Sequence, residues 1–196
     1  MKKILFNDTY GLTQAVLDGR KTMTRRIMKE GTPLGNWDIT VKHSRYQEGD
    51  IVAIAQKYID LKDCDAFYEA LEKADPSFPL ECVKGEKGCY NKMFVKADWM
   101  PHHIRIKDIC IERLQDISEK DALREGVYAH TVELDETPGV HPYTSYAYNA
   151  KIGGNIKRWW YETPRKAFAA LIDKVSGKGT WDSNPWVWVY EFELVN

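Results

Sequence analysis

Four side chains that could bind or react with a small polar ligand lie within six residues near the start of the chain. They are Lys21, Thr24, Arg25 and Arg26. Together they offer an amine, a hydroxyl and two guanidiniums, and a guanidinium suits a phosphate, a carboxylate or the edge of a base. The structural alternative is a solvated basic turn, because Lys and Arg are mostly exposed and need no function.

The neighbouring sequence predicts the elements that position this cluster. A short amphipathic helix is indicated by apolar residues at helical spacing, Leu12, Ala15 and Val16. Gly19 ends that helix, because a residue without Cβ adopts the left-handed conformation at low cost. A strand is predicted to follow as far as about Met28, since its β-branched threonines favour extended chain.

A second stretch of interest runs from residue 114 to 126. Ser118 and Asp121 form a capping box, which predicts a helix from Glu119 to Glu125. Gly126 ends this helix in the same way as the glycine after the first one. Glu125 is therefore expected at the end of a short, well-capped helix.

Three stretches resemble the ASCH domain, the small β-barrel relative of the PUA RNA-binding domains. The order Gly19-Arg20-Lys21-Thr22-x-Thr24-x-Arg26 is similar to the motif of that family. The run 114–126 resembles the segment that carries the family's acidic residue, and Glu125 is the matching position. The string from Gly177 to Phe192 is similar to ASCH proteins of phage and prophage type.

The resemblance implies an α+β fold with a PUA-like small β-barrel and flanking short helices. It covers residues 11–55, 100–127 and 163–194, in the order of the family. The whole chain, 1–196, is then a single domain with insertions at about 57–100 and 128–162. In phage-type proteins a basic, Trp-containing segment follows the Met-Pro step, whereas this chain has His102 and His103 there.

One branch of the family hydrolyses the acetyl amide of N4-acetylcytidine with a Lys as proton acceptor, a Thr as nucleophile and a Glu as proton donor. The resemblance transfers these roles to Lys21, Thr24 and Glu125, and it makes Arg25 and Arg26 substrate-binding residues. A base role needs a Lys21 pKa well below its usual range, which burial or a neighbouring Arg would favour and an ionised Glu125 would oppose. The rival interpretation is that Lys21 and Glu125 form a plain ion pair.

A non-enzymatic RNA- or nucleotide-binding module, or a ribonuclease, of phage or mobile-element origin is the alternative function. The second insertion is rich in aromatic residues, with glycines at 153 and 154; its aromatics are Tyr128, Tyr143, Tyr146, Tyr148, Trp159, Trp160 and Tyr161. They are predicted to pack as a loop onto the barrel or to stack on a base, which contributes about 1–3 kcal/mol per base.

The remaining elements follow from spacing and composition. Residues 51–55 read as a strand that is buried on both faces, and 103–113 as a strand whose apolar phase changes near residues 107 and 108. Thr163 and Pro164 begin a helix, and the alternating aromatics from residue 186 to 192 predict a last strand that faces the core. The first insertion contains a predicted helix at 65–73 and is otherwise too interrupted for a core of its own.

Composition limits the class of protein. The 196 residues carry a formal net charge of −1, which excludes a global basic field for long nucleic acids, although residues 1–31 hold seven Lys or Arg against three acids. No signal peptide or apolar run of about 18 residues is present, so a cytoplasmic protein without membrane contact is expected. The four cysteines match no zinc spacing, so free thiols, no metal and no cofactor are expected.

Overall fold

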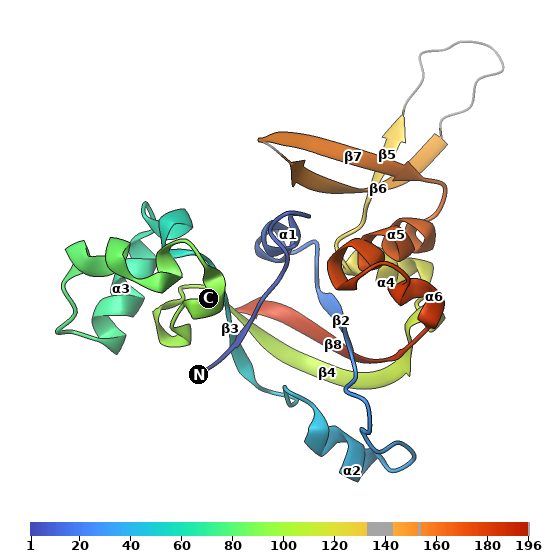
Figure 1. Cartoon of the computed structure of the whole chain (residues 1–196), viewed down its shortest axis with the longest axis horizontal. Helices are drawn as coiled ribbons and strands as arrows, with labels where there is room; N and C mark the ends of the chain where they lie inside the picture. Colours follow the sequence, from blue (N-terminus) through green and yellow to red (C-terminus); the bar gives the residue numbers. More distant parts are fainter. Residues whose placement is uncertain (133–142, 153, 196) are drawn as a thin grey trace. The chain divides into compact units, whose positions relative to one another are not determined.

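The structure is a computed structural model that describes residues 1–132, 143–152 and 154–195; residues 133–142, 153 and 196 lie outside this part, as do the side chains of 131–132 and 143–144. The described chain has an α+β fold with two sheets (Figure 1). The larger, mixed sheet consists of β1 (Lys2–Ile4), β2 (Met23–Ile27), β3 (Ile51–Ile54), β4 (His103–Arg113) and β8 (Trp186–Val195).

The predicted closed barrel is not formed by the described strands. The larger sheet has the strand order β1-β3-β4-β8-β2, in which β1 and β2 are the two ends. To close a barrel, the end strands β1 and β2 would have to pair with each other along a tilted, staggered register. With three and five residues, these two strands have few backbone groups for such pairing. The α+β prediction is therefore confirmed, whereas the closed barrel is wrong.

The chain divides into two compact units, each built from stretches that are separate in the sequence. The first unit comprises Met1–Phe6, Tyr46–Lys107 and Phe192–Asn196. The second comprises Asn7–Arg45 and Asp108–Glu191, so it contains every predicted site residue. Strands β4 and β8 each continue from one unit into the other.

In the first unit β3 is the buried strand. It pairs in parallel with β1, with Lys2 opposite Val52 and Ile4 opposite Ile54, and antiparallel with the start of β4, with Ala53 opposite His103. Three successive residues of β3, 52 to 54, have no exposed surface. The prediction of a strand that is buried on both faces is confirmed for these residues.

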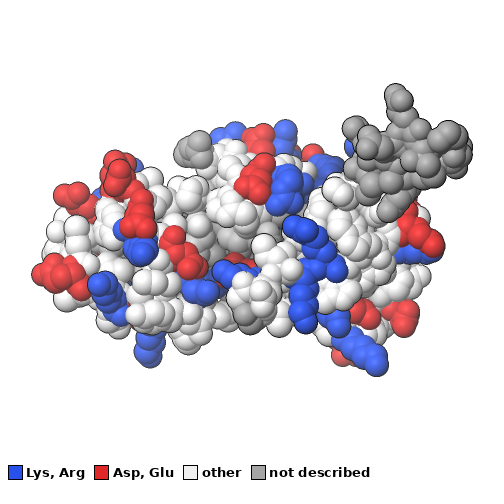
Figure 2. All heavy atoms as spheres, turned by 90° about the horizontal axis from the view of Figure 1, so that it is seen from above, with Lys and Arg blue, Asp and Glu red and all other residues white. Residues whose placement is uncertain are grey.

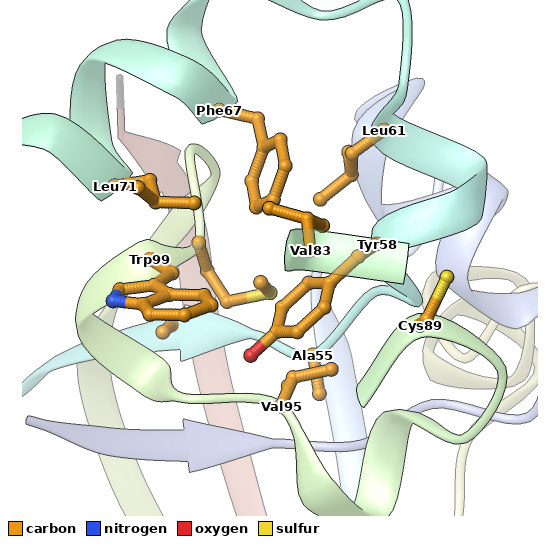
Figure 3. Packing of buried hydrophobic residues seen from close by; sticks show 11 residues of the cluster. Ala55, Tyr58, Leu61, Phe67, Leu71, Val83, Cys89, Val95 and Trp99 are labelled. Carbon is orange, nitrogen blue, oxygen red and sulfur yellow. The ribbon is translucent and has the colours of Figure 1, made fainter. Parts of the chain in front are cut away.

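The first predicted insertion forms a hydrophobic cluster together with β3. Its helix α3 (Asp65–Ala74), predicted at 65–73, is accompanied by the 3-10 turns η2 (Tyr58–Leu61), η3 (Leu80–Gly85), η4 (Lys87–Cys89), η5 (Lys92–Phe94) and η6 (Ala97–Trp99). The ring of Tyr58 stacks on Phe67 at 5.4 Å between centroids and lies 5.3 Å from Trp99 (Figure 3). Ala53 and Ala55 belong to the same cluster, so short turns obtain a core by packing on β3.

Strand β4 shows the predicted change of phase. Ile104 and Ile106 are buried at alternate positions, Lys107 and Asp108 are both exposed, and Ile109 is buried again. Two successive exposed residues shift the buried positions by one, which is the effect that a bend in the strand has.

In the second unit the predicted helices form where their caps indicate. Helix α1 (Leu12–Leu17) ends before Gly19, which has a φ of 72°. Helix α4 (Glu119–Arg124) begins with Ser118, whose Oγ accepts a hydrogen bond from the Asp121 backbone N–H at 3.0 Å. Helix α5 (Pro164–Ser176) begins with Thr163 as its cap. The shorter elements are α2 (Trp37–Thr40), η1 (Val41–His43), η7 (Leu114–Asp116) and α6 (Thr180–Ser183).

Strand β2 is antiparallel to β8, from Met23 opposite Glu191 to Ile27 opposite Val187. The prediction that the aromatics of β8 are core residues is confirmed for Trp188 and Tyr190, which are buried. The neighbouring residues on the other face, Val187 and Val189, are also buried, so this part of β8 lies inside the unit on both faces.

The second predicted insertion is a three-stranded antiparallel sheet and not a loop. Its order is β5 (Tyr128–Val132), β6 (Tyr143–Ile152) and β7 (Asn155–Tyr161). On one face Tyr148 is buried and stacks on Trp159 at 5.4 Å and Tyr161 at 6.0 Å, with α5 packed against β6 and β7. Gly153 and the Tyr143 side chain lie outside the described residues.

No helix in the described part of the chain combines the length and the apolar character needed to cross a membrane.

Phe67→Ala tests the cluster of the first unit. Phe67 has no exposed surface, so its truncation leaves a cavity and is expected to lower the free energy of unfolding by about 3–5 kcal/mol in urea titrations. The matched control is Phe94→Ala, because Phe94 is 57% exposed and its loss should change stability by less than about 1 kcal/mol. Equal effects of the two substitutions would contradict a packed cluster.

Candidate functional site

Lys21 lies in the second unit with its ammonium group buried. Its backbone N–H donates to the Ala15 carbonyl at 2.8 Å, which fixes the chain directly after α1. Nζ donates to Glu125 Oε2 at 2.6 Å and to the backbone carbonyls of Glu125 and Met23, each at 2.8 Å. An ammonium has three N–H donors, so these three acceptors match its full capacity.

Gly126 allows the end of α4 to approach Lys21 closely. Its φ is 105°, and a Cβ added there would lie 3.0 Å from Leu12 Cδ2 and 3.6 Å from Lys21 Cδ. The backbone of Thr22 donates to the Arg124 carbonyl at 3.0 Å, which ties the same two segments together. The glycine that ends the predicted helix therefore also places Glu125 beside the amine.

Arg25 completes the buried charge cluster. Its Nη1 donates to Glu125 Oε1 at 3.1 Å, while Nε and Nη2 contact Glu112 Oε1 at 2.8 and 2.7 Å. The two oxygens of Glu125 are thus divided between Lys21 and Arg25. Arg25 was expected to bind substrate; in this geometry it positions Glu125, and a direct contact with substrate stays a prediction.

The environment of Lys21 favours the neutral amine more than water does. Burial lowers the pKa of Lys21 below its usual value of 10.5, and the charges of Arg26 and Arg25 act in the same direction. The Glu125 carboxylate acts against this, through its charge and its hydrogen bond. The sequence argument that burial and nearby arginines would lower this pKa is consistent with these contacts.

Thr24 is buried, but its side chain lies on the face of β2 opposite to the face of Arg25. Side chains alternate along a strand, so Thr24 and Arg26 share one face while Met23 and Arg25 share the opposite one. Within the described residues no hydrogen bond joins the Thr24 hydroxyl to Lys21 or Glu125. The structure brings Lys21, Arg25 and Glu125 into one cluster, and it leaves Thr24 outside the hydrogen bonds of that cluster.

The surroundings of Thr24 contain polar groups that the sequence did not reveal. Its cross-strand partner is Tyr190, whose hydroxyl is 2.8 Å from Ser44 Oγ, and both residues are buried. Cross-strand partners share a face, so the hydroxyl pair of Tyr190 and Ser44 lies on the same side of β2 as Thr24. Arg26 lies on this face too, opposite Trp188.

Arg124 forms a further charged group next to the cluster. It pairs with Glu191 at 2.7 Å and Asp121 at 3.4 Å, and its Nε donates to Thr22 Oγ1 at 3.1 Å. Sequence reasoning missed Glu112, Arg124 and Glu191 as partners. Only the Asp121–Arg124 pair had a local signal, because residues three apart face each other on a helix.

The described residues contain no group of three or more His, Cys, Asp or Glu that could hold a metal ion. The four cysteine thiols are free. The short contact of 2.6 Å between Lys21 Nζ and Glu125 Oε2 lets one proton reside on either the amine or the carboxylate, so the chemistry that the cluster itself offers is proton transfer.

Comparison of the chain with models of known protein families, with curated proteins and with solved structures returns no match.

Glu125→Gln tests the stability of the cluster. It removes the charge between Lys21 and Arg25, so we expect the free energy of unfolding to fall by about 3–5 kcal/mol. The matched control is Glu191→Gln, since Glu191 is 37% exposed and its pair with Arg124 should contribute about 0–1 kcal/mol. A loss for Glu125→Gln no greater than that of the control, measured by urea unfolding, would show that the buried pair does not stabilise the unit.

Lys21→Met tests the direction of the pKa shift. Between the lowered pKa of folded Lys21 and 10.5, the unfolded chain holds a proton that the folded chain has released. The contribution of Lys21 to stability therefore rises with pH in this interval. Urea unfolding from neutral pH to 10.5 should show the wild type gaining stability relative to Lys21→Met. The control is Lys29→Met, at an exposed position, for which the difference in free energy of unfolding from the wild type should stay the same across this interval. A wild type that loses stability relative to Lys21→Met in this interval would contradict a lowered pKa of Lys21.

Proposed function

We propose that the protein hydrolyses an amide on a modified nucleoside such as N4-acetylcytidine, and that its larger sheet is an open relative of the PUA-like ASCH fold. The observation that carries the proposal is the buried contact of 2.6 Å between Lys21 Nζ and Glu125 Oε2. These residues are 104 positions apart, and they are the two for which the family resemblance implies proton acceptor and proton donor.

The pair can supply a base and an acid from a single proton. Transfer of a proton from Nζ to Oε2 gives a neutral amine beside a neutral carboxylic acid. Burial favours this uncharged pair, because both ions lose their hydration, whereas the charge of Arg25 favours the carboxylate. Glu112 offsets part of that effect, since it accepts two contacts from the same guanidinium.

The hydrolysis then follows as two acyl transfers. The Thr24 oxygen bonds to the acetyl carbon, and its proton passes to the Lys21 amine. The C–N bond breaks, its electron pair stays on N4 of the cytosine, and the Glu125 carboxyl gives that nitrogen a proton. Water then cleaves the acetyl ester on Thr24, which releases acetate and restores the hydroxyl.

The reaction requires Lys21 to exchange one of its carbonyl acceptors for the Thr24 hydroxyl. One of these acceptors is the carbonyl of Met23, the residue directly before Thr24. The acceptor that Lys21 gives up and the hydroxyl that replaces it are therefore neighbours in the sequence. Arg26 shares the face of Thr24, so it is the arginine that is placed to bind a substrate attacked by this hydroxyl.

A non-enzymatic RNA- or nucleotide-binding role is the second candidate, with a ribonuclease as a variant of it. One observation favours binding without hydrolysis. Lys21 Nζ has three acceptors, and this is the coordination expected of an ammonium group in a structural ion pair.

Incubation with N4-acetylcytidine, followed by chromatographic detection of cytidine, tests the hydrolase. Lys21→Met, Thr24→Val and Glu125→Gln should each lower kcat/KM at least about 100-fold, because each removes a proton-transfer group or the nucleophile. Lys29→Met is the matched control and should keep at least about half of the activity, because Lys29 is exposed and surface substitutions away from such groups change little.

Thermal unfolding of each variant separates loss of chemistry from loss of fold. No cytidine from the wild type, or undiminished cytidine from Lys21→Met, would refute the hydrolase. Binding to short RNAs that is lost in Arg25→Ala and Arg26→Ala would then support the second candidate.

A further inference from the structure

The three-stranded sheet carries a cavity of about 410 Å³ that is separate from the charge cluster. Its lining residues come from all three strands and from the turn after α1, and they are Arg20, Tyr128, His130, Asn149, Arg158 and Trp160. We call this cavity the sheet pocket. A volume of this size is in the range of small-ligand sites.

The strand register explains why these residues meet. Tyr128 pairs with Ala147, and Ala147 pairs with Trp160, so the three form one row across the sheet. Asn149 pairs with Arg158 in the next row on the same face. The small side chain of Ala147 between Tyr128 and Trp160 leaves space in the middle of the row.

Aromatic rings form one wall of the sheet pocket. Trp160 is 47% exposed, with the ring of His130 at 5.3 Å and that of Tyr128 at 6.3 Å between centroids. The opposite face of the sheet is the one that packs Tyr148 into the interior, so the exposed indole is not needed for the core. An exposed indole with its face available is a platform on which a planar ring can stack.

The charge of the sheet pocket is positive. Two guanidiniums line it, those of Arg20 and Arg158, and no carboxylate does. Arg20 also contacts the Asp18 carboxylate at 3.0 Å outside the lining, so within the described residues Arg158 is the guanidinium of the two that has no such ion pair. The described residues of β5, β6 and β7 include Lys151, Lys157 and Arg158 and no Asp or Glu. Figure 2, which views the molecule from the side of this sheet, shows a group of Lys and Arg side chains near the middle of the face.

An oriented amide provides hydrogen bonding beside the rings. The hydroxyl of Tyr128 donates to Asn149 Oδ1 at 2.6 Å, so the amide nitrogen is the group that can donate to a ligand. A second hollow of about 340 Å³ shares Arg20, Tyr128 and Asn149 with the sheet pocket and extends to Asp8, Tyr10 and Lys151, so its charge is mixed. The site therefore has room for more than one ring.

We infer that the sheet pocket binds a nucleotide, with the base stacked on Trp160 and the phosphate held by Arg20 and Arg158. A stacking platform, two guanidiniums and an amide are the combination that recognises a planar base joined to a phosphate. Lys21, Thr24 and Glu125 do not line the pocket, so this inference does not rest on the proposed hydrolysis.

Isothermal titration of the full chain with CMP and AMP tests the inference. Neither probe carries an acyl amide, so the result is independent of hydrolysis. Binding should be at least tenfold weaker for cytidine, which lacks the phosphate, and for inorganic phosphate, which lacks the base. Comparison of UMP with hexauridylate identifies the source: tighter binding of the hexanucleotide assigns the pocket to single-stranded RNA, and equal affinity assigns it to free nucleotides.

Matched substitutions locate the binding. Trp160→Ala should weaken binding about five- to 150-fold, the range for loss of one stacked base. Arg158→Gln should weaken it at least tenfold. Trp37→Ala and Lys157→Gln are the controls, because Trp37 is also 47% exposed and Lys157 lies next to Arg158 on the other face of β7. Both controls should bind within about twofold of the wild type.

Circular dichroism of each variant confirms that the sheet is retained. Absence of nucleotide binding in the wild type, or binding unchanged by Trp160→Ala and Arg158→Gln, would overturn the inference. A loss of similar size in Lys157→Gln and Arg158→Gln would also overturn it, since it would indicate general attraction by basic residues instead of a site.

Discussion

The buried contact of Lys21 and Arg25 with Glu125 is the constraint on which the second unit depends. Removal of an ion from water has an effective cost of several kcal/mol per ion, and only close partners offset it. Each charge therefore needs its partner at hydrogen-bond distance, and the cluster provides this with two cations facing Glu125 and Glu112. The end of α1, the start of β2 and the end of α4 must all come together for these contacts to form.

Two glycines make that approach possible. Gly19, at a φ of 72°, turns the chain from α1 towards β2, so that Lys21 directly follows the helix. Gly126 ends α4 where a Cβ would press on Leu12. A residue with a side chain would be strained in its backbone at both positions, and at the second Leu12 would also have to shift by a few tenths of an ångström.

The same contact can serve stability or chemistry, but in different protonation states. As ions, Lys21 and Glu125 hold the segments together. As a neutral amine and a carboxylic acid, they form the pair that the proposed amide hydrolysis would use, and burial narrows the free-energy difference between these two protonation states. Side chains alternate along β2, so the Thr24 hydroxyl lies on the face opposite to Arg25 and is outside the hydrogen bonds of the Lys21–Glu125 pair. In the proposed reaction, substrate binding is therefore linked to a movement of Lys21 towards Thr24.

Features that depend on residues a few positions apart could be predicted from the sequence. The caps at Ser118 and Thr163, the helix end at Gly19 and the phase change in β4 are local, and the structure has them where the pattern predicts. The tertiary structure alone decided what depends on distant segments. It decided that Arg25 binds two carboxylates, that Tyr190 lies beside Thr24 and that the 57–100 stretch packs on β3. The physical reason is that burial, strand register and ion pairing are fixed by which surfaces meet. A single sequence carries no local signal for partners such as Arg25 and Glu125, or Thr24 and Tyr190, which lie far apart in the chain.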